Sequence, residues 1–337
     1  MKGLMGMSMP SSAIAVRGLR KSFKDKVVLD GVDLDITQGT VFSLLGPNGA
    51  GKTTTVRILS TLVKADAGQA WVGGHDLASE PDQVRAAIGV TGQFAAVDGL
   101  LTGFENLVLM GDLNHLGKRE SRQRAMELLE KFDLADAMKK PLATYSGGMR
   151  RRLDLAMTLV GRPRIIFLDE PTTGLDPRSR RMMWQLIHEL VERDGVTIFL
   201  TTQYLEEADQ LADRIAVLDH GRLVAEGTSE ELKRLVPGGH VSLRFAAAAE
   251  LDLAARALGE NHRDDEDLTL QVPSDGGVRP LRALLDRLDR ANVEPAELTV
   301  HTPDLDDVFL ALTDRSAHSA ALPTTMTPPI TKAGALR

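Results

Sequence analysis

Short apolar runs alternate with helical periodicity between Ile14 and about Leu235. Some of these runs are almost continuously apolar, as strands are when both faces of a parallel sheet are covered. They are residues 40–46, 164–170, 196–202 and 214–221. Residues 102–140 instead carry a helical pattern without a good strand. The pattern predicts an α/β fold with a parallel sheet and a helical insert.

A second pattern begins after the turn cluster VPGGH at residues 236–240. It predicts two strands and then two amphipathic helices, at residues 241–245, 268–272, 278–291 and 303–314. Asp304 is suited to cap the last of these helices. We therefore expect a small C-terminal α+β domain at residues 237–314.

The two ends of the chain differ from the segments between them. We expect residues 1–12 to form a flexible leader. Residues 315–337 form a tail rich in proline and threonine, for which we expect disorder. The main α/β domain is expected at residues 13–236, with a helical subdomain at about residues 95–160. The chain is thus predicted to hold two domains between two loose ends.

Composition narrows the possible functions. The 337 residues include no cysteine, which excludes disulfides and thiolate metal sites, and the net charge of −7 gives no support to nucleic-acid binding. The three arginines at residues 150–152 are better explained as a helix face that pairs with nearby acids. No run approaches the about 20 apolar residues that span a bilayer, and the first residues do not resemble a signal peptide. We expect a soluble, cytoplasmic protein that needs a partner for any membrane role.

The stretch GPNGAGKTT at residues 46–54 fits G-x-x-x-x-G-K-[ST] between a predicted strand and a predicted helix. In such a loop, backbone amides wrap a phosphate chain, Lys52 reaches the β- and γ-phosphates, and the Thr53 hydroxyl binds Mg²⁺. The expected nucleotide-binding residues are Gly46, Pro47, Asn48, Gly49, Ala50, Gly51, Lys52, Thr53 and Thr54. A glycine-rich turn that binds nothing is the alternative, but strand, lysine, hydroxyl and helix all favour the phosphate loop.

Asp169 and Glu170 follow another predicted buried strand. Ligands of parallel α/β sheets bind at the carboxyl ends of the strands. Asp169 is therefore suited to hold Mg²⁺, and Glu170 is suited to polarise an attacking water. The alternative is a pair of acids that end a strand and meet solvent; the phosphate loop in the same chain makes it the weaker interpretation.

Together, these motifs resemble those of the ATP-binding subunits of ABC transporters over residues 14–235. The phosphate loop is similar to the Walker A motif, and Asp169 and Glu170 are similar to the Walker B motif with its catalytic glutamate. Gln93 is similar to the Q-loop glutamine, which the resemblance places at the metal with Thr53 and Asp169. The resemblance implies ATP and Mg²⁺ as cofactors and ATP hydrolysis as the reaction.

Residues 145–149, YSGGM, resemble the signature motif, with tyrosine where leucine is common and methionine where glutamine is common. The resemblance implies that two copies stack head to tail, so that this motif of one copy contacts the γ-phosphate held by the other. Its contact residues would be Ser146, Gly147 and Gly148. A helix N-terminus does bind phosphate well, but a serine N-cap with glycines for close packing is the alternative.

Three further positions take their meaning from the resemblance. Asp176 lies in a stretch similar to the D-loop and would contact nucleotide. Phe23 lies where the family places an aromatic residue that stacks on adenine, although a lone phenylalanine is more often part of a core. Gln203 stands where the family usually has histidine. Glutamine donates and accepts hydrogen bonds but does not become a cation near neutral pH, so we expect slow hydrolysis with Gln203 as a catalytic, positioning group.

Longer stretches resemble the daunorubicin/doxorubicin-resistance type of exporter ATPase. They are residues 92–107, 145–156, 169–180, 201–221 and 305–313. The resemblance implies a homodimeric ATPase at the cytoplasmic face of the cell membrane, which powers efflux of a hydrophobic, anthracycline-like drug through a separate ABC-2-like permease. Alternatives are an exporter of lipid, glycan or other endogenous cargo, a non-transport ABC ATPase, and a regulatory module with a degenerate site. The C-terminal domain would support or regulate the dimer, or act as a structural cap.

Overall fold

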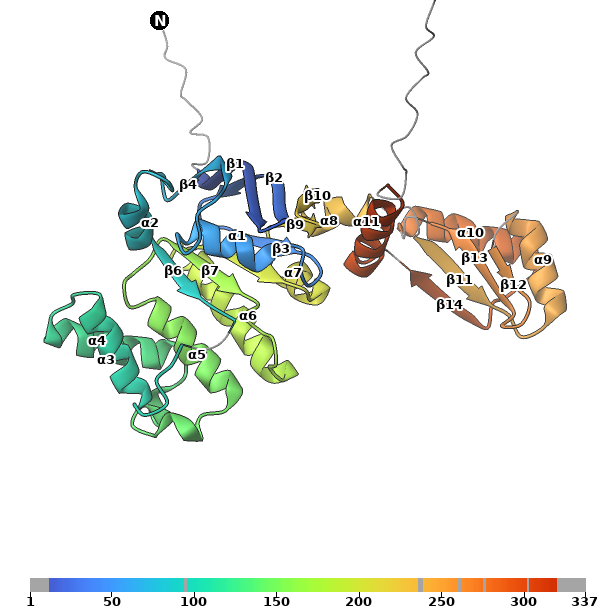
Figure 1. The fold of residues 1–337 in the computed structure, drawn as a ribbon. Helices are drawn as coiled ribbons and strands as arrows, with labels where there is room; N and C mark the ends of the chain where they lie inside the picture. The colour runs from blue at the N-terminus through green and yellow to red at the C-terminus, as the bar shows by residue number, and fades with distance from the viewer. Residues whose placement is uncertain are drawn as a thin grey trace, which may run out of the picture.

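The computed structural model describes residues 12–93, 96–235, 239–259, 262–274, 277–301 and 303–319. A central sheet, a second sheet above it and a helical segment below it form the part before residue 236 (Figure 1). A third sheet with its own helices follows. Among the described residues, no helix is both long and apolar enough to cross a membrane.

The central sheet has the strand order β10-β9-β3-β8-β7-β6. Its strands are β3 (Val41–Leu45), β6 (Ile88–Thr91), β7 (Ile165–Asp169), β8 (Thr197–Thr202), β9 (Arg214–Asp219) and β10 (Arg222–Gly227). Strand β3 pairs in parallel with β8 and β9, and β7 pairs in parallel with β6 and β8. The four apolar runs are β3, β7, β8 and β9, so the predicted parallel sheet is confirmed. The carboxyl ends of β3, β7 and β8 consequently lie at one edge.

Apolar side chains cover both faces of this sheet. Along β7, Phe167 belongs to one buried cluster, whereas its neighbours Ile166 and Leu168 belong to another. The Phe167 ring lies 5.5 Å from that of Phe199, which lies 5.7 Å from that of Phe42. The flanking helices are α1 (Lys52–Leu59), α2 (Pro81–Ala87), α6 (Pro177–Glu192), α7 (Leu205–Leu211) and α8 (Ser229–Lys233). A strand buried on both faces explains why its sequence is continuously apolar.

The second sheet is antiparallel and has the order β2-β1-β4-β5. Its strands are β1 (Ser12–Phe23), β2 (Lys26–Thr37), β4 (Ala67–Val72) and β5 (His75–Asp76). The sequence patterns did not predict it. In β2, buried Val32, Leu34 and Ile36 alternate with exposed or half-buried residues, as in a sheet with one face in the core. The β1–β2 hairpin is important because it reaches the phosphate loop.

The helical segment contains α3 (Gly103–Leu113), α4 (Lys118–Lys131) and α5 (Gly147–Thr158), with short 3₁₀ turns at Ala135–Ala137 and Leu142–Thr144. Thr102 and Glu105 form a reciprocal capping box that starts α3 where the helical pattern begins. Tyr145 is buried, and its hydroxyl donates to the Ala137 carbonyl over 2.9 Å. This tyrosine therefore anchors the chain directly before α5.

The third sheet is antiparallel with the order β12-β13-β11-β14. Its elements are β11 (His240–Arg244), α9 (Ala248–Leu258), β12 (His262–Asp264), β13 (Thr269–Pro273), α10 (Val278–Arg290) and β14 (Glu297–His301). Val241, Leu243 and Leu270 pack against leucines of α9 and α10. The predicted strands and the first predicted helix are present, and α9, β12 and β14 are additional.

The last helix, α11 (Leu305–Ser319), begins at the predicted Asp304 cap, where the Asp307 N–H donates to Asp304 Oδ1 over 3.0 Å. It extends beyond the expected end of the domain at residue 314. Its Leu305 and Val308 belong to a cluster with residues of α7, β9 and α8. The helix therefore packs on the part before residue 236, between it and the third sheet in Figure 1. The rest of the predicted tail and the leader up to residue 11 lie outside the described residues.

Candidate active site

The phosphate loop connects β3 to α1 at the carboxyl edge of the central sheet. Gly51 has φ 114°, a conformation that side chains rarely adopt, and a Cβ there would lie 2.9 Å from the Val28 carbonyl oxygen. At Gly46, a Cβ would lie 2.2 Å from the carbonyl oxygen of Leu218. Both positions therefore require glycine, because the backbone approaches β2 and β9 too closely for any side chain.

Lys52 starts α1 and is 5% exposed. Its Nζ donates to the carbonyls of Gly46 over 2.8 Å and Pro47 over 3.2 Å, and lies 3.8 Å from Glu170 Oε1. Burial lowers the pKa of Lys52, while the Glu170 and Asp169 carboxylates act in the opposite direction. A buried ammonium inside a loop of backbone amides is well placed to bind an anion.

Asp169 ends β7 and is 5% exposed. Its Oδ1 accepts hydrogen bonds from the Thr53 hydroxyl over 3.2 Å and the Thr201 hydroxyl over 2.6 Å. Hydroxyl and carboxylate oxygens are the ligands that Mg²⁺ prefers, and this ion usually keeps waters and phosphate oxygens as its other ligands. The described residues contain no group of three acidic, histidine or cysteine side chains that could hold a metal alone. The pair Thr53–Asp169 therefore fits Mg²⁺ that is shared with a phosphate.

Glu170 follows Asp169 in a left-handed conformation with φ 50°. Such a conformation is uncommon for residues other than glycine and often occurs at functional sites. Its N–H donates to the Thr201 carbonyl over 3.1 Å, and its Oε2 accepts from the Thr173 hydroxyl over 3.3 Å. The turn thus aims the carboxylate back towards Lys52.

A cavity of about 300 Å³ lies over the phosphate loop. It is lined by Lys26, Val28, Asn48, Gly49, Gly51, Lys52, Thr53, Thr54, Gln93 and Glu170. The structure thus brings Gln93 and Glu170 to the loop from the ends of two other strands. Lys26 and Val28 were not predicted, since neither belongs to a motif and only the hairpin places them there.

Phe23 ends β1 and is 48% exposed. It pairs in register with Lys26, which lines the cavity, and Lys21 Nζ lies 5.2 Å from its ring centre. Phe23 is therefore an exposed aromatic ring beside the site and not a core residue. Its face is accessible to a flat apolar group such as a base.

The segment Ser146–Gly148 starts α5. Ser146 Oγ accepts the N–H of Met149 over 3.2 Å, and a Cβ at Gly148 would lie 2.5 Å from Ser179 Oγ of α6. A Cβ at Gly147 would meet no described atom within 4 Å. The serine cap and close glycine packing expected from the alternative interpretation are thus present. None of the three residues lines the cavity around Lys52 in the described part of the chain.

Asp176 caps α6. Its Oδ1 accepts the N–H groups of Arg178 and Ser179, each over 3.0 Å, and its Oδ2 accepts the Ser179 hydroxyl over 2.6 Å. The hydrogen bond from the Ser179 side chain, followed by those from the backbone, lowers the pKa of Asp176. Because Ser179 also packs on Gly148, the first turns of α5 and α6 lie in contact with each other.

Gln203 directly follows β8 and is half-buried. It shares the carboxyl edge of the sheet with Asp169, because β8 pairs with β7. It is not among the described residues that line the 300 Å³ cavity. The structure places Gln203 beside the site, one residue after a strand that contributes Thr201 to Asp169.

Two buried charged positions were missed by the sequence patterns. Glu207 on α7 is fully buried, and its Oε1 accepts the Thr172 hydroxyl over 2.7 Å and Trp184 Nε1–H over 3.2 Å. Arg151, expected on a helix face that pairs with nearby acids, is only 7% exposed. The expected pairing with acids does occur, at Asp154 for Arg151 and at Asp133 for Arg152, whereas the burial of Arg151 was not predicted.

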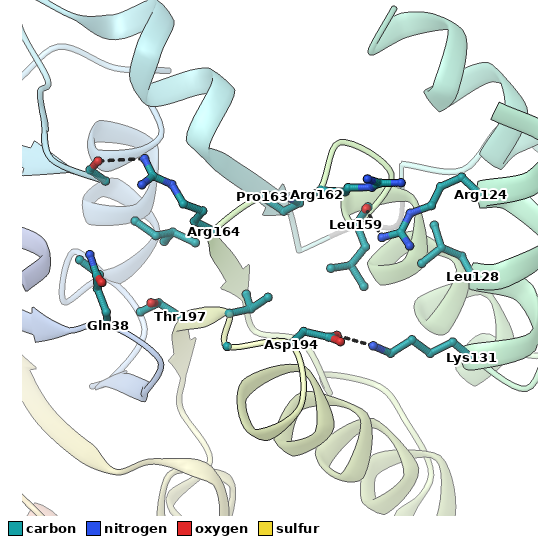
Figure 2. A pocket seen from close by; sticks show the side chains of 15 residues that line it. Gln38, Arg124, Leu128, Lys131, Leu159, Arg162, Pro163, Arg164, Asp194 and Thr197 are labelled. Atoms are coloured by element: carbon teal, nitrogen blue, oxygen red, sulfur yellow. Dashed lines mark hydrogen bonds and ion pairs between the residues drawn. The ribbon is translucent and has the colours of Figure 1, made fainter. Parts of the chain in front are cut away.

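A larger cavity of about 440 Å³ lies elsewhere, at the amino ends of β7 and β8 (Figure 2). Its cationic side chains already have partners: Lys131 pairs with Asp194, and Arg124 donates to the Leu159 carbonyl over 3.0 Å. Ligands of parallel sheets bind at the opposite, carboxyl ends. The smaller cavity with the phosphate loop is therefore the candidate active site.

Comparison with known proteins decides the family. The ABC transporter family profile matches residues 29–173. A daunorubicin/doxorubicin resistance ATP-binding protein of Streptomyces peucetius is 49% identical over 322 residues, which cover 93% of this chain and 97% of the relative. The chain belongs to the ATP-binding proteins of ABC transporters. As such it is an ABC ATPase, and the predicted family, fold and reaction are confirmed.

Two further matches agree with this assignment. A doxorubicin resistance ATP-binding protein of Mycobacterium tuberculosis is 49% identical over 312 residues, which cover 89% of this ABC ATPase and 93% of the relative. A solved ATP-binding cassette, dimeric in a post-hydrolysis state with ADP and Pi, is 28% identical with a TM-score of 0.58. It covers 64% of this chain and 98% of the solved chain. The solved cassette therefore corresponds to a part of this chain only.

Proposed function

We propose that this ABC ATPase powers an exporter of a hydrophobic, anthracycline-like drug. The observation that carries the proposal is the 49% identity to a daunorubicin/doxorubicin resistance protein over 93% of the chain. That match is far longer than the ABC transporter profile, at residues 29–173, so it includes much of the C-terminal part. An ATPase alone does not contact cargo, and fold alone does not determine function.

The proposed site uses ATP with Mg²⁺. The loop amides and Lys52 bind the phosphates, and Phe23 offers its exposed face to adenine. Thr53 and Asp169, with Gln93 nearby, would hold Mg²⁺, which supplies positive charge at the phosphates. Glu170 accepts a proton from the attacking water, and Gln203 orients that water or the γ-phosphate by hydrogen bonding.

The proposed assembly is a head-to-tail homodimer. Ser146 and Gly147 are exposed at the start of α5, and a helix N-terminus is suited to a phosphate, but in this chain these residues lie outside the cavity around Lys52. Ser146, Gly147 and Gly148 would therefore complete the site of a second copy, with Asp176 beside them. The chain would act at the cytoplasmic face of the membrane with a separate ABC-2-like permease.

Drug efflux tests the proposed function. Cells would produce this chain with the membrane protein encoded beside it, and efflux of a fluorescent anthracycline would be measured. The Lys52→Ala variant should lose efflux because its site lacks the buried phosphate-binding cation. Lys64→Ala, which alters an exposed lysine, is the matched control and should keep efflux.

Two other results would contradict the proposal. Efflux that persists in Lys52→Ala cells would show that this ATPase does not drive it. Absence of efflux in all cells, with ATP hydrolysis intact in the purified unaltered protein, would exclude the anthracycline and leave lipid, glycan or other cargo.

A further inference from the structure

Arg151 lies on the second turn of α5, and all its polar contacts are internal. Its Nε donates to the Pro171 carbonyl over 2.8 Å. Its Nη1 donates to the Gly92 carbonyl over 2.7 Å and lies 3.3 Å from Asp154 Oδ2. Its Nη2 donates to the carbonyls of Asp169 and Glu170, each over 3.2 Å. A guanidinium has five N–H donors in a rigid plane, and these five acceptors match them.

The acceptors belong to segments that carry the site. Gly92 directly precedes Gln93, and the Asp169 and Glu170 carbonyls belong to the Walker B residues themselves. Glu170 is held on both sides of its left-handed conformation, by Thr201 at its N–H and by Arg151 at its carbonyl. Arg151 therefore fixes the peptide groups from which the Glu170 carboxylate projects.

Asp154, one turn further along α5, extends this arrangement. Its Oδ1 accepts the N–H of Ala96 over 2.9 Å. Gly92 and Ala96 flank Gln93, so the arginine holds the chain before this glutamine and the aspartate holds the chain after it. The pair thus connects one helix to two of the segments that line the cavity, those with Gln93 and Glu170.

Stability alone does not account for this pair. Arg151 and Asp154 are 7% and 4% exposed. Burial lowers the pKa of Arg151 and raises the pKa of Asp154, so in each case desolvation outweighs the attraction of the partner. Buried ion pairs often contribute little net stability compared with apolar side chains of similar volume. What the pair does provide is a defined geometry between separate segments.

We propose that Arg151 and Asp154 are positioning residues for ATP hydrolysis. From α5, the helix that starts at the signature motif, they set the orientation of Glu170 and of the loop around Gln93. The inference rests on the proposed role of Glu170. Since Ser146 caps α5, a shift of this helix on contact with a second copy would move the Glu170 peptide directly.

The test compares Arg151→Lys with Arg150→Lys in the purified full-length protein. Lysine keeps the charge but presents three donors from one atom, so it cannot satisfy the five acceptors that the planar guanidinium reaches. We expect kcat of Arg151→Lys to fall at least about tenfold, because a small misplacement of reacting groups slows catalysis strongly. KM for ATP should stay within about twofold of the value for the unaltered protein. Arg150 is exposed, so Arg150→Lys should resemble the unaltered protein.

Rates are measured well below the unfolding temperature of each variant. Unfolding of a variant is then not mistaken for a decrease in kcat. Equal kcat values for Arg151→Lys and Arg150→Lys would overturn the proposal. So would a fall in turnover that only matches a fall in the folded fraction. If Arg151→Lys does not fold, Asp154→Asn decides by the same criteria, because its Oδ1 still accepts the Ala96 N–H while the ion pair is lost.

A separate variant keeps the two proposals distinguishable. Glu170→Gln should abolish hydrolysis while binding of ATP persists. If it hydrolyses ATP at the unaltered rate, the proposed role of Glu170 fails whatever Arg151→Lys does. If Glu170→Gln is inactive and Arg151→Lys is fully active, only the positioning proposal fails.

Discussion

Glu207 shows how a single buried carboxyl group can connect functional segments. It lies on α7, the helix that follows Gln203, and its Oε1 accepts hydrogen bonds from Thr172 and Trp184. Its Oε2 is buried and has no hydrogen-bond partner among the described residues. Burial, the largest effect, raises the pKa of Glu207. The folded protein therefore favours the protonated carboxyl more than the unfolded chain does.

The pKa of Glu207 predicts a pH-dependent effect of Glu207→Gln. Because the folded-state pKa is raised, the stability that this carboxyl contributes is present below its unfolded pKa and decreases as pH rises through the folded pKa. Glutamine keeps the Oε1 acceptor and never ionises. The melting temperature of Glu207→Gln minus that of the unaltered protein should therefore increase from pH 5 to pH 8, as differential scanning calorimetry would measure. A difference that is constant or decreases with pH would contradict the assigned pKa direction.

At the scale of residues, the sequence predicts what is local. The phosphate loop and the acidic pair each occupy a few adjacent positions, so their chemistry can be predicted before the fold is known. The burial of Arg151 was not predicted, because its carbonyl acceptors at Gly92 and Pro171 are distant in sequence. Backbone carbonyls are present at every position, and no pattern marks the ones that a buried arginine will meet.

Helix α11 is the element that links the C-terminal part to the ATPase core. Leu305 and Val308 are 3% and 1% exposed and share a cluster with Ile215 of β9 and Leu232 of α8. The same cluster includes Ala208 of α7, one residue after Glu207. Movement of α11 would therefore change the packing of α7, the helix that follows Gln203.

Substitution of Val308 tests this docking. Val308→Asp would bury an unpaired charge in the cluster and should destabilise the ATPase domain by about 2–4 kcal/mol. Leu310→Asp is the matched control: this leucine of the same helix is 60% exposed, and exposed substitutions usually change stability by less than about 0.5 kcal/mol. Urea unfolding of both variants measures the difference. Equal destabilisation would show that the cluster does not depend on α11.

At the scale of elements, burial decides which strands could be predicted. Strands β3, β7, β8 and β9 are covered on both faces and are continuously apolar, so they were recognised. The parallel strand β6 lies at the edge of the sheet, includes the exposed Val90 and was not recognised. Strand β2 places polar residues between its buried ones, and β14 has no fully buried residue. Such strands need neighbours to be recognised, and these neighbours are far away in the chain.

At the scale of the whole molecule, the proposed working form is a dimer of two copies. A substitution at the start of α5 should disrupt this dimer without disturbing the fold of each copy. With Mg-ATP, Glu170→Gln should run as a dimer in size-exclusion chromatography, because ATP stays bound between the copies. Adding Gly147→Arg should keep it monomeric: the new side chain meets no described atom of its own chain within 4 Å of its Cβ, yet it would block the partner's nucleotide. A monomeric Glu170→Gln at micromolar concentration would contradict the head-to-tail dimer.

The return of α11 to the ATPase core also affects the order in which the protein becomes complete during synthesis. Domains generally fold as units while the chain emerges from the ribosome at about 5–20 residues per second. Ile215 and Leu232 emerge before the whole third sheet, whereas Leu305 and Val308 emerge after it. The nascent ATPase domain therefore carries an uncovered apolar edge until α11 emerges. Chaperones that recognise exposed apolar surface would meet this chain at that edge, during that interval.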